Sequence, residues 1–302
     1  MTSPPQKSFA LNPAIVETLK HAALVCSSLS AGGLLDEETT TGVILGAFAA
    51  TYPLLAKTDE SPPMRWHRFN KAPATNKDSE AANGADFAVV VLGEDGSARL
   101  AIFQAKRSAL SKTKSGWRLD VRHTVKDAYG KNSSQMVALE VLGIALMATN
   151  KSNKNDQSSY LPTCTDLSWI HYLLYGPGMP VCIALSSMVE NLKAERSLSG
   201  SSNFFSFNPD ESPSFGDILA EVALPSTPKW LTVETKSLFG GLPAWIKMMP
   251  VMVGGTDKAW TFFPKNRRAF LPTQDSWRKK EAPAPCNLKL VTGLKKPSPL
   301  AS

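Results

Sequence analysis

The chain has 302 residues, of which 43% are hydrophobic and 20% are charged, the composition of an ordinary globular protein with a sizeable core. Its longest apolar stretch, Gly42–Ala56, is shorter than the roughly 18 residues that a membrane-spanning helix needs, and Pro53 interrupts it. The first residues lack the basic and then apolar pattern of a secretory signal. We therefore expect a cytoplasmic protein that does not bind membranes.

The net charge of +7 is distributed unevenly along the chain. Residues 106–131 hold eight Lys or Arg against two acids, and residues 258–296 hold ten against two, so the remainder is acidic. Two basic stretches on an otherwise acidic protein are typical of a face that binds a polyanion, although two solvated loops would give the same pattern. Charge alone leaves both interpretations open.

The four cysteines lie far apart, without a Cys-x-x-Cys pair. A disulfide framework or a structural zinc site needs closer or more regular spacing. Cys164, His171 and Cys182 could be imagined as metal ligands, but we expect buried thiols and a strand histidine.

Two helices are predicted in the N-terminal part. Asn12 and Pro13 form the start of a helix that ends near residues 32–33, because Asn is a good N-cap and Pro suits the first helical position. Asp36 can cap a second helix over residues 37–55, with Glu37 and Glu38 in its first turn. These acids suit the positive end of the helix dipole, and a catalytic role for one of them is the alternative.

A short strand is predicted over residues 64–70, followed by a polar loop, residues 71–83, that carries Glu80. Residues 87–92 and 100–103 are almost continuously apolar, which is typical of strands in the middle of a sheet covered by helices. Residues 94–97 between them form a good hairpin turn, since a glycine there supplies the positive φ.

Beyond the hairpin we expect a basic loop over residues 108–116, a helix within 127–150, a strand over 167–175 and a strand running into a helix over 181–195. Residues 196–216 are rich in Ser, Asn and Pro and give the best internal boundary. Short apolar strands or loops follow at 230–233, 248–253 and 260–263, and a loose tail ends the chain.

The end of the hairpin combines an acid with a Gln-x-Lys sequence. Asp86 begins the first strand, and Gln104, Ala105 and Lys106 end the antiparallel second strand, so these ends lie together. The Asp86 carboxylate, the Gln104 amide oxygen and the Ala105 carbonyl are oxygen ligands of the kind that Mg²⁺ prefers. Lys106 could hold a phosphate and orient the attacking water. Such a spacing also occurs by chance.

The acid Glu80, the stretch Gly84-x-Asp86, a strand and then Gln104-Ala105-Lys106-Arg107 resemble the PD-(D/E)XK nuclease superfamily, in particular its variants in which glutamine replaces the acid of (D/E)XK and the lysine is kept. The resemblance covers residues 36–176 and includes Gln135 ahead of an apolar helix. It implies an α/β fold with a restriction-endonuclease-like αβββαβ core, a mixed central sheet flanked by helices, and a C-terminal extension. The family's acid corresponds here to the neutral Gln104.

This resemblance implies a metal-dependent nuclease that hydrolyses phosphodiester bonds, with Mg²⁺ as cofactor and Mn²⁺ as a substitute. The expected catalytic residues are Asp86, Gln104, Lys106 and an additional acid, for which Glu38 is preferred over Glu37. The expected metal ligands are Asp86, Gln104, the Ala105 carbonyl, Glu38 and the alternative acid Glu80.

The implied partner is nucleic acid, with DNA preferred, and the basic stretch behind Lys106 would supply the phosphate contacts. The expected contact residues are Arg107, Lys112, Lys114, Arg118, Arg122, Lys126 and Gln135. A homodimer or a protein partner is compatible with the same sequence. Bacterial or phage-related defence is the setting that the resemblance suggests.

Three parts of the chain are predicted: an N-terminal helix packing on the core (1–35), a nuclease-like core (36–195) and a C-terminal extension with short strands and a basic tail (196–302). Two alternatives to a nuclease acting in defence stay open. One is a catalytically silent fold that binds nucleic acid or protein, and the other is an antibacterial nuclease toxin.

Overall fold

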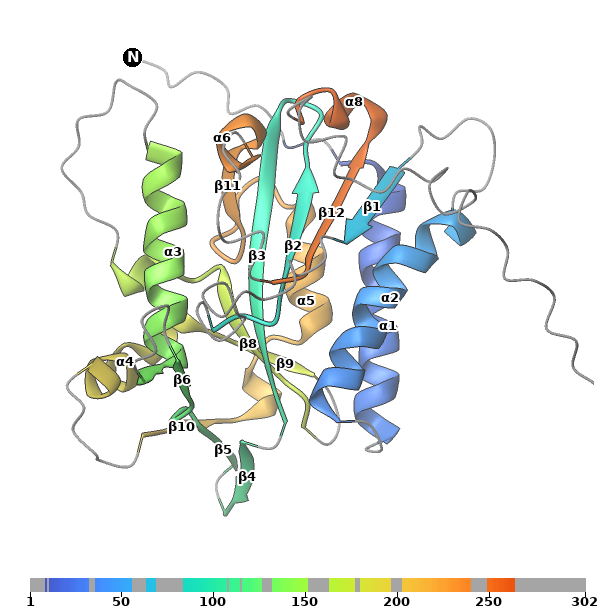
Figure 1. Cartoon of the computed structure of the whole chain (residues 1–302). Coiled ribbons are helices and arrows are strands. Elements are labelled where there is room, and N and C mark those ends of the chain that lie inside the picture. The colour runs from blue at the N-terminus through green and yellow to red at the C-terminus, as the bar shows by residue number, and fades with distance from the viewer. Residues whose placement is uncertain are drawn as a thin grey trace, which may run out of the picture.

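A mixed β-sheet of seven strands lies at the centre of the protein in the computed structural model (Figure 1). The structure describes residues 9, 11–32, 36–55, 64–68, 84–107, 109–114, 116–126, 132–151, 163–176, 180–196, 203–239 and 249–263. None of the helices in this described part is both long and apolar enough to cross a membrane.

The strand order of the sheet brings distant parts of the chain together. It runs β1 (Met64–Arg68), β12 (Val251–Thr256), β2 (Phe87–Leu92), β3 (Ser97–Lys106), β8 (Ile170–Leu174), β9 (Val181–Ala184), and β11 (Leu231–Glu234) pairs with the first part of β3. β12 with β2 and β3 with β8 are parallel, whereas the other pairs are antiparallel. The C-terminal third of the chain therefore contributes two strands to the same sheet.

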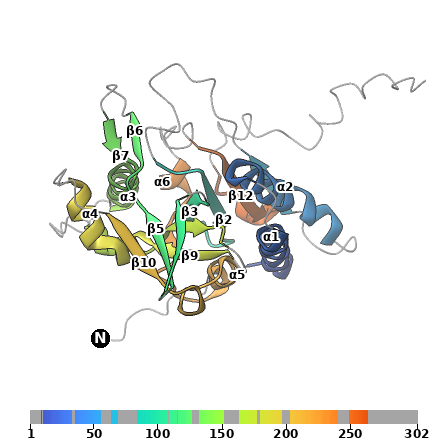
Figure 2. The ribbon, with the colours of Figure 1, turned by 90° about the horizontal axis from the view of Figure 1, so that it is seen from below.

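Helices cover both faces of the sheet. One face carries α1 (Pro13–Gly32), α2 (Glu37–Leu55) and α5 (Phe215–Ala220), and the other carries α3 (Gln135–Lys151), α4 (Val189–Arg196) and α6 (Thr235–Phe239). Figure 2 shows α1 and α2 on one side of the strands and α3 and α4 on the other. The last described helix is the short α8 (Asp257–Trp260).

The hairpin of β2 and β3 is buried on both faces, as its apolar sequence predicts. Alternate side chains divide between two cores: Val90 and Ile102 pack on the α3 side, and Val89 and Phe103 pack on the α1 and α2 side. Gly96 has a φ of 88°, which permits the tight turn between the strands. This hairpin is the rigid element on which the candidate site is built.

Two smaller sheets lie beyond the end of β3. Three antiparallel strands, β4 (Leu110–Thr113), β5 (Gly116–Asp120) and β10 (Phe204–Phe207), form one, and β6 (Thr124–Lys126) with β7 (Asn132–Ser134) forms the other. Short 3-10 helices occupy residues 164–166, 185–188, 209–211 and 221–223. In Figure 1 the strands β4 and β5 extend below the central sheet.

The coarse expectation of an α/β protein with a mixed central sheet and flanking helices is confirmed. The helices over residues 13–32 and 37–55 are found with their predicted caps, since the side chains of Asn12 and Asp36 accept hydrogen bonds from backbone N–H groups of the first turn. The strand running into a helix over 181–195 is found as β9 followed by α4.

One local prediction was wrong. The basic stretch 108–116, expected as a loop, contains strand β4, whose polar residues pair with β5 at the surface. The helix expected within residues 127–150 is found as α3, which begins at Gln135 because residues 132–134 pair with β6. The short helix α8 over residues 257–260, which the side chain of Thr256 caps, was not predicted.

Candidate active site at the ends of β2 and β3

Asp86 is fixed at the start of β2 by the end of β3. Its backbone N–H donates to the Phe103 carbonyl at 3.0 Å, and its Oδ2 accepts from the Ala105 N–H at 2.7 Å and from Gln104 Nε2 at 2.6 Å. Gln104 is only 1% exposed, and its Nε2 also donates to the Ala105 carbonyl at 2.9 Å. The expected grouping of Asp86, Gln104 and Ala105 is therefore present.

Lys106 and the first helical turn of α2 meet at the same end of the sheet. Lys106 is 8% exposed, and its Nζ lies 3.9 Å from Glu37 Oε1. The other oxygen of Glu37 accepts from the Arg107 N–H at 2.9 Å, which joins α2 to the end of β3. Asp86 thus contacts Gln104 of β3, and Lys106 lies near Glu37 of α2.

Glu37, rather than the preferred Glu38, lies beside Lys106. Glu38 follows one position later on α2 and is exposed. One residue advances a helix by about 100°, so two consecutive side chains cannot face the same neighbour. Of the two acids on α2, Glu37 is therefore the one beside Lys106.

Gln135 joins the group from the opposite side, as the first residue of α3. Its Nε2 donates to Gln104 Oε1 at 2.9 Å, and it is 7% exposed. Gly84, with a φ of 72°, sits against it so closely that an added Cβ would lie 2.5 Å from the Gln135 carbonyl. Gly84 therefore allows the start of α3 to approach the hairpin.

Two further polar residues lie around this site and were not predicted. Partial desolvation and the charge of Lys106 lower the pKa of His123, whereas the charge of Glu37 raises it. His123 therefore has its imidazole near Lys106 and Glu37. Its carbonyl accepts from the Gln135 N–H at 2.8 Å. Burial raises the pKa of Tyr172 well above its usual range, and the charges of Glu195 and Asp86 add to this. Neither residue stands in a spacing motif that could have indicated it.

Oxygen atoms of two kinds lie together at this site. No group of three or more His, Cys, Asp or Glu side chains that could hold a metal occurs among the described residues. Asp86 contributes a carboxylate and Ala105 a carbonyl, both acceptable to Mg²⁺. Gln104 departs from the prediction, because its amide presents nitrogen rather than oxygen to both of them.

The predicted phosphate-binding residues are spread over the three-stranded sheet beyond Lys106. Lys112 and Lys114 are exposed in and after β4. The guanidinium groups of Arg118 and Arg122 lie 4.2 and 4.8 Å from the ring centre of Phe204, which β10 supplies. The Arg122 guanidinium also donates two hydrogen bonds to the Asp120 carboxylate, of 2.9 and 2.6 Å, and this pairing partly neutralises its charge.

Some of the predicted site residues lie outside the part of the chain that the structure describes. Glu80 falls outside the described residues, and so does the side chain of Lys126 at the end of β6. The second basic stretch, 258–296, is described only as far as residue 263. Their roles stay predictions.

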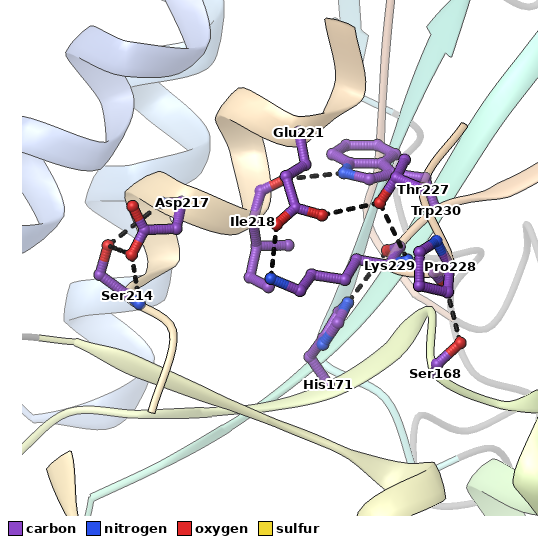
Figure 3. A network of polar contacts seen from close by, with 10 residues as sticks. All are labelled: Ser168, His171, Ser214, Asp217, Ile218, Glu221, Thr227, Pro228, Lys229 and Trp230. Atoms are coloured by element: carbon purple, nitrogen blue, oxygen red, sulfur yellow. Dashed lines mark hydrogen bonds and ion pairs between the residues drawn. The ribbon is translucent and has the colours of Figure 1, made fainter. Parts of the chain in front are cut away.

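A second group of polar residues lies on the other face of the sheet and is shown in Figure 3. His171 Nε2 contacts the Lys229 carbonyl at 3.1 Å, and Lys229 Nζ pairs with Glu221 at 2.5 Å. Glu221 also accepts from the Thr227 hydroxyl at 2.7 Å. These contacts connect the loop before β11 to β8, so this group of residues stabilises the fold. His171 lies on β8, so the expected strand histidine is found.

Comparison with known proteins adds no relative, since no protein-family model, curated protein or solved structure matches this chain.

Proposed function

We propose that the protein is a divalent-metal-dependent nuclease of the PD-(D/E)XK type that hydrolyses phosphodiester bonds of DNA, in bacterial or phage-related defence. The observation that carries the proposal is the meeting of Glu37, Asp86, Gln104 and Lys106 at one end of β2 and β3. The order α2, β1, β2, β3, α3, β8 along the chain agrees with a restriction-endonuclease-like αβββαβ core. β12, between β1 and β2 in the sheet, is an addition to that order.

The residues that would hold Mg²⁺ or Mn²⁺ are Asp86, the Ala105 carbonyl and the Gln104 amide. When bound, such an ion supplies an activated water and neutralises charge on the phosphate. The protein keeps these donors in place because Asp86 is hydrogen-bonded to the β3 backbone. A site built on strands in this way is more precise than one on loops.

Lys106 is the residue that would hold the scissile phosphate. Its buried position raises the strength of its interaction with an anion, and Glu37 keeps the ammonium beside the sheet end. Both α2 and α3 begin at this site, with Glu37 and Gln135 as their first residues. Two helix N-termini favour an anion between them. The arrangement therefore suits a phosphate group.

A catalytically silent module that binds nucleic acid is the second candidate, and one observation favours it. The Gln104 amide turns its nitrogen to Asp86 and Ala105, and nitrogen that carries hydrogens cannot bind a cation. In that case the basic residues of β4 and β5 would still bind DNA.

The test is incubation of the purified full chain with plasmid and single-stranded DNA in Mg²⁺, Mn²⁺ or EDTA. We expect cleavage that needs metal, and we expect Asp86→Asn and Lys106→Met to lower its rate by about a hundredfold or more. Lys20→Ala, an exposed residue of α1 paired with Glu17, is the matched control and should cleave normally. Cleavage that survives both site variants would overturn the site, and salt-sensitive binding without cleavage in any metal would favour the silent module.

A further inference from the structure

The Gln104 amide fills the position between two oxygens that a cation would use. Its Nε2 lies 2.6 Å from Asp86 Oδ2 and 2.9 Å from the Ala105 carbonyl oxygen. The two amide hydrogens carry partial positive charge, so this arrangement satisfies the acceptors without a metal. A divalent cation and the Gln104 nitrogen therefore compete for the same pair of oxygens.

A half-turn of the Gln104 amide would exchange its nitrogen and oxygen. The oxygens of Gln104, Asp86 and Ala105 would then face one another, which is unfavourable without a cation because like partial charges repel in a buried site. The rotated nitrogen would meet Gln135, whose Nε2 now donates to Gln104 Oε1. The buried Gln135 Oε1 has no hydrogen-bond partner among the described residues, so a matching turn of Gln135 would supply the acceptor.

The charges at the site indicate what could favour this rotation. Asp86 and Glu37 carry negative charges, Lys106 carries a positive charge beside Glu37, and Gln104 is neutral. A single carboxylate ligand, here Asp86, makes a weak site for a divalent cation, and a phosphate of the substrate would bring a second anionic oxygen. The phosphate would thus offset the loss of the hydrogen bonds that Gln104 makes in the resting site.

We propose that Gln104 keeps the resting site closed to the divalent cation, and that a bound polyanion phosphate opens it through the joint rotation of the Gln104 and Gln135 amides. Metal and nucleic acid then raise each other's affinity by the same factor, since linkage is reciprocal. This inference rests on the proposed function and adds a regulation of its metal site. A cation would therefore bind about tenfold more tightly when substrate is present.

The test measures Mn²⁺ affinity of the full chain by electron paramagnetic resonance, with and without a 12-residue phosphorothioate DNA strand that resists cleavage. We expect the strand to raise wild-type Mn²⁺ affinity about tenfold and Mn²⁺ to raise strand affinity equally. As a control, the Asp86→Asn variant is measured with the same strand, and the Mn²⁺ bound in that sample is the Mn²⁺ that the DNA binds by itself. Gln104→Glu has no donor to turn toward Asp86, so it should bind Mn²⁺ about tenfold more tightly than wild type without DNA, with coupling below about threefold.

Failure of the two proposals can be told apart. Mn²⁺ binding that depends on Asp86 and is equal with and without the strand would overturn the inference and leave the metal site standing. Equal coupling in wild type and Gln104→Glu would also overturn it, because the amide would then play no part. Mn²⁺ binding that Asp86→Asn leaves unchanged would overturn the proposed metal site itself.

Nuclear magnetic resonance of the glutamine side chains detects the rotation directly, without a measurement of metal affinity. With ¹⁵N-labelled glutamine, the signals of Gln104 and Gln135 are assigned by their loss in Gln104→Glu and Gln135→Met. We expect both pairs of amide signals to move when Mg²⁺ and the strand are added together, and neither to move with Mg²⁺ alone. Movement of the Gln104 signals with Mg²⁺ alone would contradict the closed resting site.

Discussion

The carboxylate of Glu37 accepts a hydrogen bond from the Arg107 N–H at 2.9 Å and places its other oxygen 3.9 Å from Lys106 Nζ. It thereby fixes the first turn of α2 to the end of β3, next to Lys106, the lysine proposed to hold the phosphate. The role of Glu37 can be separated from that of Glu38, which is exposed.

Glu37→Gln should lower the rate of DNA cleavage by about ten- to a hundredfold, because it removes the charge beside Lys106. The new side chain still offers an oxygen to the Arg107 N–H, so the fold should be retained. Initial rates of plasmid cleavage, with thermal unfolding as a check on folding, measure this. Glu38→Gln is the matched control, and an equal loss of rate in both variants would count against the assignment.

The basic residues of the small sheet should contribute unequally to DNA binding. Lys112→Ala and Arg118→Ala should each reduce the salt dependence of binding by about 0.9 in the slope of log affinity against log salt, as expected for one lost phosphate contact on duplex DNA. Arg122→Ala should change it less, because Asp120 already pairs with Arg122. Fluorescence anisotropy at several salt concentrations measures the slopes.

Lys20→Ala, on the exposed side of α1, is the control for this series. Equal slopes in Lys112→Ala and Lys20→Ala would show that the small sheet does not contact phosphate. A slope loss in Arg122→Ala as large as that in Arg118→Ala would show that the Asp120 pair opens on binding.

Gly84→Ala should destabilise the protein and damage the site together. The residue has a φ of 72°, and an added Cβ would lie 2.5 Å from the Gln135 carbonyl. We expect the free energy of unfolding to fall by about 1–3 kcal/mol. Gly42→Ala, at a position where a Cβ would meet nothing within 4 Å, should instead raise it by about 0.5–1 kcal/mol, since alanine favours a helix. Urea unfolding compares them, and an equal loss in both would refute the packing argument.

An ion pair with one buried partner links α3 to α4. The Glu140 side chain is 2% exposed, and Arg196 binds both its oxygens, one through Nε at 3.0 Å. Arg196→Met should lower the free energy of unfolding by about 2 kcal/mol, because it leaves Glu140 buried without its partner; the figure is below that for a wholly buried pair since Arg196 is 52% exposed. The double variant Arg196→Met with Glu140→Met should recover most of this loss in urea unfolding. No recovery would mean that the pair contributes through packing alone.

Local signals predicted the elements that depend on local physics. Caps at Asn12 and Asp36 defined the starts of α1 and α2, and the apolar runs of β2 and β3 placed the hairpin at the centre of the sheet. Asp86, Gln104 and Lys106 were found because antiparallel strands bring their ends together at a fixed register. These parts need no knowledge of distant contacts.

The rest depended on tertiary contacts that local patterns in the sequence do not reveal. The placement of β12 between β1 and β2 joins segments more than 160 residues apart in the chain. The choice of Glu37 over Glu38 follows from the angle at which α2 docks on β3, which packing decides. His123 comes near Lys106 only because the short strands beyond β5 fold back to the start of α3.

His171 should make the protein less stable in acid. It is 1% exposed, it contacts the Lys229 carbonyl through Nε2, and its Nδ1 has no hydrogen-bond partner within the described residues. Burial lowers its pKa to about 4 from the ordinary value of 6.5, and the nearby Lys229 and Glu221 act in opposite directions. The folded state therefore holds a neutral imidazole, whereas the unfolded state takes up a proton as soon as the pH falls below 6.5.

Because the unfolded state binds the extra proton, stability is present above pH 6.5 and is lost as the pH falls toward 4, by about 3 kcal/mol for this group. His171→Phe cannot titrate and should stack on Phe103 as the imidazole does, with ring centres now 5.4 Å apart. Its free energy of unfolding should be lower than that of wild type at neutral pH, because the Lys229 carbonyl loses a donor. The difference between the two proteins should shrink or reverse near pH 4.5. Urea unfolding at pH 7.5 and 4.5 measures this, and parallel losses in both proteins would show that carboxylates alone cause the acid sensitivity.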